Sequence, residues 1–534
     1  IASGWESNEN FTEWIVRLRP GAKWSDGQPF TADDIMFWYN DILLNKDLMP
    51  GGANWMKNDD GSMAKVEKLS HYMVKWSYKQ PNTAFLLNLA NMDGADKSIS
   101  NLVFVPAHYL KQFHPNHASK SNLDKKVKAA GFDTWTQLFA VEALPHLSGN
   151  RPGMAGWVPN GSTVSDRVFK IKRNPYFVGV DPAGNQLPYI DEIHFTFFAD
   201  KETLNLAAVS GKIDFQGRHI NMSTYPVLKE NEGQSNYRVV TWPTFGGSDA
   251  VVMFNQTWQG PEGEYFRNKQ FRIALSHAIN RDGIKELAFF GLGESRQGVP
   301  APFHPYYPGD EYAFKYTQYD SSKANKILDG IMPKKGSDGF RVMSNGKTLD
   351  IEIGVVPAFG AWTDIAQLIV ENWAEIGVKA HVEVRERTVH FAMRPANELM
   401  AEVWNEDTTG FPFSGQPKFD PRSDPALTFA PLVAKWYATN GKEGVAPQPA
   451  IKRIVEIIDE AKTSSRNRQV ALAKELFSIW ADNVYEIGTV GLTPMIQGVL
   501  VANKKLRNIP EVAGNDWPLR TPGDTRLEQY FYVK

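Results

Sequence analysis

Hydrophobic and polar residues alternate in several short segments of the chain, which is the pattern of strands with one buried face. Other segments repeat apolar residues every three or four positions, as amphipathic helices do. We predict strands at residues 11–18, 66–77, 193–198, 237–241, 250–255, 349–356 and 378–386, with extended chain at 487–500. We predict helices after the N-cap candidate Thr31 and at residues 81–91, 201–210, 271–279, 282–291, 362–375, 451–463 and 467–483.

The order of these elements indicates the fold class. A strand at 349–356, a helix at 362–375 and a strand at 378–386 predict an α/β lobe with at least partly parallel strands. Residues 116–166 are less regular and contain several Gly, Pro and Asn residues, so we expect a surface subdomain there. A chain of 534 residues exceeds the size of one hydrophobic core, which stops growing near roughly 250–300 residues, so we expect two or more lobes.

Composition excludes several classes of function. Lys and Arg (58) nearly balance Asp and Glu (60), so a broad basic surface for nucleic acid is not expected. The absence of cysteine excludes disulfides, thiolate metal sites and cysteine nucleophiles. No run approaches the ~18 apolar residues of a membrane span. A predicted strand begins soon after Ile1, so we expect the natural N-terminus to lie upstream.

Motifs for covalent or metal chemistry are missing from the sequence. There is no G-x-S-x-G, no S-x-x-K with its usual companions and no H-E-x-x-H. Gly291 and Gly293 follow a predicted helix and lack a third glycine and a lysine, so we interpret them as a turn. His114 and His117 are spaced for a metal, but Pro115 breaks any helix aligning them and no third ligand has a matching spacing. We expect no catalytic residue, no metal and no cofactor.

The stretch AEVWNEDTTGFPF at residues 401–413 joins a tryptophan, an amide and two adjacent acids. Neighbours on an extended chain point to opposite faces, so Glu406 and Asp407 do not face each other as the two carboxyls of a glycosidase must. One of them could pair with a distant acid, which the sequence does not mark. The same alternation places Trp404 with Glu406 and Asn405 with Asp407, so each face suits ligand binding.

Tryptophan is abundant, with 16 residues in the chain. Trp24 and Trp38 have apolar neighbours and are expected in the core. An exposed indole gains by covering an apolar sugar or side-chain face. The tryptophans in polar, turn-rich settings are therefore better candidates for ligand contact, namely Trp157, Trp242, Trp258 and Trp404.

Seven blocks of sequence occur along the chain in an order typical of one family. They are VRLRPGAKWSDGQPFTADDIMFWYNDIL (16–43), RNPYF (173–177), LPYIDEI (187–193), SGKID (210–214), FRIALSHAINRDGIKELAFFGLG (271–293), YDSSKANKILD (319–329) and VENWAEIGVKAHV (370–382). Together they resemble the solute-binding proteins of ABC importers, of the large family 5 type that includes dipeptide, oligopeptide and nickel binders.

The resemblance implies an α/β, two-lobed periplasmic-binding-protein fold of type II, with an extra subdomain in the first lobe. Two crossing strands join the lobes and ligand is enclosed between them. On this pattern lobe I comprises residues 1–245 and 491–534, and lobe II comprises residues 246–490. The crossings map to residues 244–255 and 485–495, where the alternation already predicts extended chain.

Within this family the chain is similar to a group associated with oligosaccharide import, including α-galactosides. The similar stretches are HYLKQFHP (108–115), DPAGNQLPYID (181–191), WYATNGKEG (436–444), EIGTVG (486–491) and EQYFYVK (528–534). Peptide binders of the family use a W-x-x-D element to meet an ammonium group, and Trp404 to Asp407 keeps that spacing. An oligopeptide or opine-like solute is therefore an alternative, and a glycoside hydrolase is the alternative from another class.

The resemblance and the residue types lead to a set of expected ligand contacts. The primary candidates are Trp404, Asn405, Glu406 and Asp407, and the secondary candidates are Arg218, His219, Trp242, Phe245, Asn255 and Trp157. The expected partners are a small-molecule ligand and a membrane ABC permease, with no nucleic acid and no membrane span. We expect a monomer in the periplasm, or an extracellular protein held at the membrane by a removed N-terminal anchor.

Overall fold

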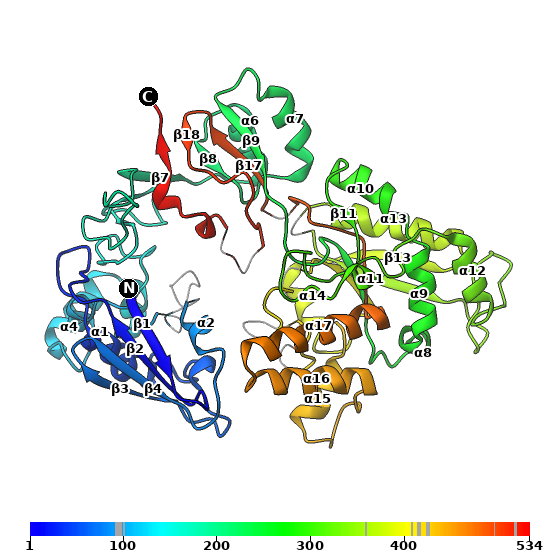
Figure 1. The fold of residues 1–534 in the computed structure, drawn as a ribbon, viewed down its shortest axis with the longest axis horizontal. Helices are drawn as coiled ribbons and strands as arrows, with labels where there is room; N and C mark the ends of the chain where they lie inside the picture. The colour runs from blue at the N-terminus through cyan, green and yellow to red at the C-terminus, as the bar shows by residue number, and fades with distance from the viewer. Residues whose placement is uncertain are drawn as a thin grey trace. The chain divides into compact units, whose positions relative to one another are not determined.

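The computed structural model describes the chain except for residues 91–98, 100–101, 358–359, 407–408, 414–417, 423–427, 496, 517–518 and 520. The described chain divides into two compact units, shown as a ribbon in Figure 1. Unit 1 comprises residues 1–199 and 526–534, and unit 2 comprises residues 200–525. Each unit contains buried hydrophobic clusters of its own.

Unit 1 is built on two antiparallel sheets. The first has the order β1-β2-β4-β3, with β1 at Ala2–Ser7, β2 at Glu13–Leu18, β3 at Lys65–Ser70 and β4 at Met73–Ser77. The second has the order β5-β6-β7, with β5 at Trp157–Pro159, β6 at Val168–Arg173 and β7 at Glu192–Thr196. The helical elements are α1 (Ala32–Phe37), η1 (Trp38–Leu43), η2 (Asn54–Met56), α2 (Phe85–Ala90), α3 (Ala107–Leu110), η4 (Lys111–Phe113), α4 (Lys120–Ala129) and α5 (Trp135–Ala143).

The predicted cap of the first helix is confirmed. The Thr31 hydroxyl accepts a hydrogen bond from the Asp33 N–H at 3.2 Å, and the Asp34 carboxylate accepts from the Thr31 N–H at 3.0 Å. These two bonds satisfy N–H groups that have no partner inside the helix. The expected core residues Trp24 and Trp38 are each 1% exposed.

Two sequence predictions for unit 1 are wrong in detail. The segment 66–77 is not one strand, because the chain reverses at residues 71–72 between β3 and β4. Its alternation continues through the two-residue turn, which hides the reversal. The segment 116–166 contains two helices, α4 and α5, and the capping box of α5 between Thr134 and Gln137 was not recognised from the sequence.

Unit 2 is built on a five-stranded sheet of order β13-β12-β14-β10-β15. The strands are β10 (Val251–Phe254), β12 (Asp350–Val355), β13 (Lys379–Val384), β14 (Ala401–Trp404) and β15 (Glu486–Gly488). The predicted parallel pairing is confirmed, since β12 pairs in parallel with both β13 and β14. β10 is antiparallel to its neighbours β14 and β15.

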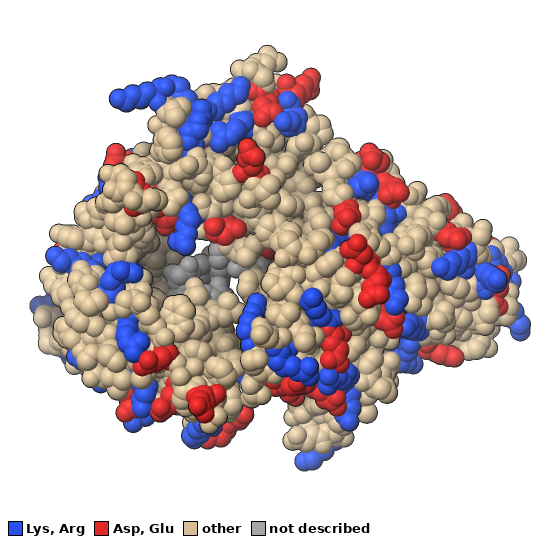
Figure 2. Space-filling model, in the orientation of Figure 1, with Lys and Arg blue, Asp and Glu red and all other residues tan. Residues whose placement is uncertain are grey.

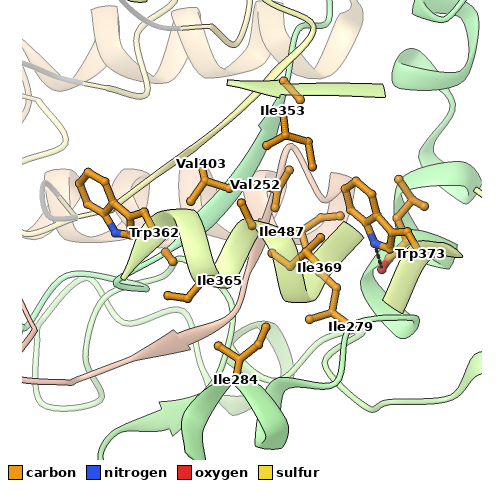
Figure 3. Close-up of a cluster of buried hydrophobic side chains, with 14 of the residues drawn as sticks. Val252, Ile279, Ile284, Ile353, Trp362, Ile365, Ile369, Trp373, Val403 and Ile487 are labelled. Atoms are coloured by element: carbon orange, nitrogen blue, oxygen red, sulfur yellow. Dashed lines mark hydrogen bonds between the residues drawn. The ribbon is translucent and has the colours of Figure 1, made fainter. Parts of the chain in front are cut away.

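Apolar side chains fill the space between this sheet and the helices on one of its faces (Figure 3). The helix α13 (Trp362–Glu375) has the bounds that the sequence predicts and ends before Gly377, whose φ is +76°. The Trp373 indole N–H donates to the Leu275 carbonyl of α9 (Lys269–His277) at 3.2 Å. The predicted apolar stripe on and after α9 is buried, namely Phe271, Ala274, Leu275, Ala278 and Ile279.

The remaining helices of unit 2 enlarge this core or form a second one. Met253 of β10 joins the second cluster with α16 and α17, whereas its neighbours Val252 and Phe254 join the first. Alternate residues of a strand therefore serve opposite faces. The helices are α6 (Lys201–Val209), η5 (Met222–Thr224), α7 (Tyr225–Asn231), α8 (Gly263–Arg267), α10 (Arg281–Phe289), α11 (Asp310–Ala313), α12 (Ser321–Asp329), α14 (Arg387–Met393), α15 (Pro431–Ala438), α16 (Pro449–Ala461), α17 (Arg466–Asn483) and η7 (Gly523–Thr525), with η8 (Leu527–Gln529) in unit 1.

Two chain segments connect the five-stranded sheet to a smaller sheet of order β8-β17-β9. Residues 242–250 run from β9 to β10, and residues 492–498 run from β16 to β17. Both connections overlap the ranges predicted for the crossings. The strands concerned are β8 (Phe215–Gln216), β9 (Tyr237–Thr241), β16 (Val490–Gly491) and β17 (Val499–Asn503), and β11 (Glu294–Ser295) pairs with β16.

Asp249 fastens the two connections to each other. Its side chain is buried, and its carboxylate accepts from the Thr244 hydroxyl at 2.8 Å and from the Thr493 N–H at 2.9 Å. The Thr244 N–H also donates to the Thr493 carbonyl at 3.0 Å. The predicted lobe boundaries at residues 245 and 490 lie next to this junction, inside unit 2, and remain a prediction.

Surface charge is mixed on the face shown in Figure 2, where Lys and Arg side chains are interspersed with Asp and Glu. Among the described residues, none of the helices is both long and apolar enough to cross a membrane.

We predict that Asp249→Ala lowers the free energy of unfolding by roughly 2–5 kcal/mol, because each buried group left without a partner costs about 1–3 kcal/mol. Thr244 and Thr493 are the groups affected, at 2% and 0% exposure. Urea denaturation measures the loss. Asp249→Asn retains one acceptor oxygen and should lose less, and Asp364→Ala, at an exposed position of α13, is the control. Equal stability of all variants would contradict the role of Asp249.

Candidate functional site

Four strands of the five-stranded sheet end at one edge, and β10 begins there. β12, β13 and β14 run in parallel, and β15 has the same direction because it also pairs antiparallel with β10. Val251 at the start of β10 is opposite Trp404 on one side and Gly488 on the other. Ligands of open α/β sheets bind at the carboxyl ends of the strands. We therefore take this edge of the sheet, which we call the carboxyl edge, as the candidate site.

Trp404 is the last residue of β14 and is half-buried at the carboxyl edge. Its ring centroid lies 4.8 Å from that of Trp362 and 5.4 Å from that of Phe391. The guanidinium carbons of Arg394 and Arg387 lie 5.0 Å and 5.9 Å from the ring, within range of cation–π attraction. The indole is therefore held in an aromatic and cationic cluster and presents only part of its surface.

The two arginines of this cluster were missed by the sequence reasoning. Arg387 is the first residue of α14 and Arg394 directly follows its last residue. The N-cap of α14 is Glu386, whose carboxylate accepts from the N–H groups of Thr388 at 2.7 Å and Val389 at 3.2 Å. Their position in the sequence could have indicated the two arginines, because α14 directly follows the carboxyl end of the parallel strand β13. Guanidinium groups bind hydroxyl, carboxylate and amide oxygens through several N–H donors.

Arg394 is held in place by a buried acid on the same strand as Trp404. The Glu402 carboxylate accepts from the Arg394 guanidinium at 2.7 Å and 2.9 Å and lies 2.8 Å from His390 Nε2. Burial by itself raises the pKa of Glu402, but the charge of Arg394 and the His390 hydrogen bond outweigh it and lower the pKa to about 2. Glu402 is therefore ionised at neutral pH and orients Arg394.

Asn405 and Glu406 lie beyond the end of β14, so the predicted alternation does not extend to them. They are 5% and 2% exposed. The Glu406 N–H donates to the Ser248 carbonyl at 2.8 Å, and the Asn405 carbonyl accepts from Lys418 Nζ at 2.7 Å. Asp407 lies outside the described residues. The two described polar residues thus support the site from below the surface, and the expectation that they face a ligand openly is corrected.

The distant acid that the sequence could not mark is Glu486, the first residue of β15. A Cβ on Gly298 would lie 1.8 Å from Glu486 Oε1 and 3.6 Å from Glu406 Cγ, so both side chains pack over this glycine. Neither oxygen of Glu486 has a hydrogen bond of good geometry, and the residue is 2% exposed. Burial and the nearby Glu406 raise the pKa of Glu486 well above 4.5, with Lys418 and the Trp480 indole acting in the opposite direction.

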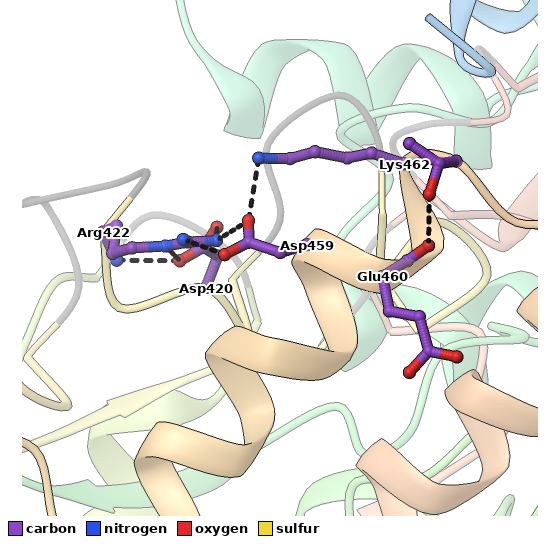
Figure 4. Close-up of polar contacts among 6 residues, drawn as sticks. Asp420, Arg422, Asp459, Glu460 and Lys462 are labelled. Carbon is purple, nitrogen blue, oxygen red and sulfur yellow. Dashed lines mark hydrogen bonds and ion pairs between the residues drawn. The ribbon is translucent and has the colours of Figure 1, made fainter. Parts of the chain in front are cut away.

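The loop that follows the site is anchored to α16 by Arg422 (Figure 4). Its guanidinium forms a two-point ion pair with Asp459, at 2.7 Å and 2.9 Å, and another with Asp420, at 3.0 Å for both contacts. Lys462 Nζ adds a contact to Asp459 at 2.9 Å. Two-point pairs fix orientation as well as distance, so they hold the base of this loop on the helix.

Phe245 reaches the neighbourhood of the carboxyl edge on the first connection. Its N–H and that of Gly246 donate to the Asp516 carboxylate at 2.6 Å and 2.8 Å, and its ring meets Phe303 edge-on at 4.6 Å. Phe303 is 66% exposed. The sequence singled out Phe245 as a candidate contact but not Phe303, because nothing in the pattern around Phe303 distinguishes it.

Two of the secondary candidates are enclosed by protein, which corrects the expectation that they are open to a ligand. The Trp242 side chain is 0% exposed and its indole N–H donates to the Pro510 carbonyl at 3.0 Å. Asn255 is also 0% exposed, and its amide donates to the Leu399 carbonyl at 3.0 Å and to the Asn397 side chain at 2.9 Å. Both side chains thus donate to backbone carbonyls of other chain segments.

The other secondary candidates lie on other elements. Arg218 and His219 follow β8 of the smaller sheet, where His219 has a φ of +68° and burial lowers its pKa, helped by the charges of Arg218 and Lys201. Trp157 lies in β5 of unit 1, half-buried, and its indole N–H donates to the Ile190 carbonyl at 2.9 Å. Their role in ligand contact remains a prediction.

A pocket of about 330 Å³ opens elsewhere on unit 2, between the chain after β10 and the start of α16. Trp258 and Gln259 line one side, and Val445 and Gln448 line the other. Trp258, which the sequence singled out as an indole in a polar setting, is tied to Glu262 by its N–H at 3.1 Å. The volume is at the lower limit of pockets for drug-sized ligands, and none of the ten expected contacts lines it.

The α/β fold of the chain matches that of type II periplasmic binding proteins. Residues 1–425 match the family described as bacterial extracellular solute-binding proteins, family 5 Middle. The chain belongs to this family.

Individual relatives bind different solutes. The periplasmic alpha-galactoside-binding protein of Rhizobium meliloti (strain 1021) is 27% identical over 96% of this chain and 70% of its own length. The chain spans 57% and 63% of two further relatives. The structure of an oligopeptide-binding protein OppA matches with a TM-score of 0.82 and 33% identity, over 100% of this chain and 84% of that one. MelB of Agrobacterium fabrum C58, solved with stachyose, matches in fold, with a TM-score of 0.63 and 21% identity over 100% and 76% of the two chains.

We predict that Glu486→Gln stabilises the protein at alkaline pH relative to the unchanged chain, because a glutamine at this buried position cannot ionise beside Glu406. Folding raises the pKa of Glu486 above 4.5, so the contribution of this carboxyl to the free energy of unfolding is fully present below pH 4.5. This contribution is lost as the pH rises through the folded-state pKa. Thermal unfolding measured over a pH series that starts at about pH 4 should show a smaller decline with rising pH for the variant. Glu371→Gln, at an exposed position of α13, is the matched control, and an unchanged pH profile for Glu486→Gln would contradict the prediction.

Proposed function

We propose that this protein captures an oligosaccharide and delivers it to an ABC importer. The observation that carries the proposal is the carboxyl edge, where the partly exposed Trp404 indole stands beside the exposed Arg387, with the buried guanidinium of Arg394 (5% exposed) holding the indole from within. A sugar offers an apolar ring face for an indole and hydroxyl groups for N–H donors. The sequence is 27% identical to an alpha-galactoside-binding protein over 96% of the chain, and this similarity supports the same class of ligand.

The proposed mechanism is closure about the two connections between the sheets of unit 2. A bend would act on the two connections that contain Thr244 and Thr493, and Asp249 keeps them moving together. Ligand favours the closed form because that form makes more contacts with it. We propose that the closed protein then docks on a membrane permease, that it acts as a monomer in the periplasm, and that the lobes are bounded at residues 245 and 490.

An oligopeptide is the second candidate ligand. The OppA structure has 33% identity and a TM-score of 0.82, so the observed likeness to a named peptide binder is also substantial. A peptide would place its ammonium group near a carboxylate, and the W-x-x-D spacing of Trp404 to Asp407 retains that option.

We propose that the protein is not an enzyme. If the protein were a glycosidase, Glu406 and Glu486 would be its pair of catalytic acids. Hydrolysis requires the sugar bond to lie between the two carboxyls, but each of these side chains is only 2% exposed. Incubation with oligosaccharides followed by product analysis tests this point, because release of shorter sugars would overturn it.

We predict that an α-galactoside such as stachyose raises the melting temperature of the purified chain, whereas peptides do not. A ligand at 100 times its dissociation constant stabilises the folded state by about 2.7 kcal/mol, enough for a clear shift. A screen of stachyose, shorter galactosides and short peptides separates the two candidates. A shift with peptides alone would replace the sugar with a peptide.

We predict that Trp404→Ala weakens binding of the ligand found in that screen by about 1–3 kcal/mol, the range of aromatic hot-spot truncations. Isothermal titration calorimetry gives the change in affinity, and urea denaturation gives the change in stability. Trp436→Ala is the matched control, because Trp436 is a half-buried indole of unit 2 on α15, away from the strand ends.

The site assignment fails if Trp404→Ala binds with unchanged affinity but is less stable, since Trp404 would then be a core residue only. Arg394→Lys retains the positive charge but loses the planar donor set. It should weaken binding while Glu402 stays paired, because a lysine no longer supports the Trp404 indole with a planar guanidinium from its buried side.

A further inference from the structure

Three side chains with metal-ligating atoms meet in unit 1, whereas the candidate site belongs to unit 2. They are Asp41 of η1 and the two histidines His114 and His117, which follow η4. Their ligand atoms all lie within 4.8 Å of one another, and within the described part of the chain this is the one such group of three. The third ligand that the sequence could not supply is therefore Asp41, located 73 residues before His114.

The distances within this group approach those of a tetrahedral zinc site. Asp41 Oδ1 lies 3.1 Å from His117 Nε2 and 3.9 Å from His114 Nδ1. Zinc bonds of about 2.0–2.1 Å place neighbouring ligand atoms about 3.3–3.5 Å apart. All three ligand atoms lie within 4.8 Å of one another. Because the His117 side chain is 30% exposed, a small rotation of it can adjust its distances to the other two ligand atoms. Its exposed side leaves room for a water as fourth ligand.

The hydrogen bonds of His114 put its ring in the form that a metal requires. The Asn116 N–H donates to Nδ1 at 3.2 Å, so Nδ1 carries a lone pair, and Nε2 is 3.0 Å from the Asp41 carbonyl, which can only accept. His114 is thus neutral with its proton on Nε2, although the Asn45 amide also lies 3.2 Å from that atom. A ligating histidine nearly always donates its other N–H to a carbonyl or carboxylate in this way.

The surrounding structure fixes the positions of the ligands. The His114 ring is 0% exposed and packs edge-on against Phe37, Trp135 and Phe139. The His114 carbonyl accepts from the N–H groups of His117 at 3.0 Å and Ala118 at 2.9 Å, which forms the turn that brings the second imidazole back to Asp41. Pro115, which prevents a helix here, is compatible with this turn.

We propose that Asp41, His114 and His117 bind a zinc ion that fastens the segment 114–117 to η1. Two imidazoles and one carboxylate with an open fourth position are a donor set that suits zinc. At this site the ion replaces the Asn116 N–H as partner of His114 Nδ1 and links chain segments that are far apart in the sequence.

Calorimetric titration of the chelator-treated full-length chain with zinc sulfate tests the proposal. We expect one ion per chain, a higher melting temperature with zinc, and a loss of affinity of about 100-fold or more in His117→Ala. Loss of an outer-shell partner alone costs roughly 10- to 100-fold, and His117 is a direct ligand. Asp41→Asn should show a loss of the same order, and neither change removes a buried apolar group.

His194→Ala is the matched control, because His194 also lies 3.0 Å from a carboxylate, that of Glu192, on an exposed surface. It should leave zinc affinity unchanged. The proposal is overturned if the wild-type chain takes up no zinc, or if His117→Ala and His194→Ala weaken binding equally, which would indicate scattered surface histidines. Cobalt in place of zinc reports the geometry by its visible absorption, and an octahedral spectrum would also contradict the site.

Discussion

β10 lies between β14 and β15, and Val251 is paired with Trp404 on one side and Gly488 on the other. This register places the ends of four strands and both connections near a single edge of the sheet. A slip of one residue would turn every side chain of β10 to the opposite face, moving Val252 and Phe254 out of one cluster and Met253 out of the other. The position of Trp404 therefore depends on packing on both faces of its neighbour.

Buried acids are treated in two opposite ways close to this edge. Glu402 has Arg394 and His390 as partners, so it stays charged and orients a guanidinium beside Trp404. Glu486 has another acid as its neighbour, and burial with Glu406 raises its pKa. The first arrangement stabilises the charge it contains, whereas the second favours a proton. The protein thus combines a fixed cationic group with an acid pair whose charge depends on pH.

Local signals in the sequence predicted many elements well. Thr31 and Asn280 begin helices where expected, and α13 has its predicted bounds, because caps and a Gly at the helix end act within a few residues. Failures occurred where the local pattern was continuous across a change of structure. The alternation of 66–77 passes through a turn, and α14 is too short to show a helical period.

The sequence by itself determined the family, the α/β class and the parallel strands around α13, and it singled out the stretch around Trp404 as a candidate site, which remains a prediction. Only the tertiary structure decided which side chains meet there. Arg394, beside Trp404, carries no local signature in the sequence. Glu486 is remote along the chain from its neighbour Glu406, and the zinc ligand Asp41 is remote from His114. Trp242 and Asn255 look like ligand contacts in sequence but are enclosed in protein. Local patterns report backbone preferences, whereas burial and long-range pairing depend on how the sheets and helices pack together.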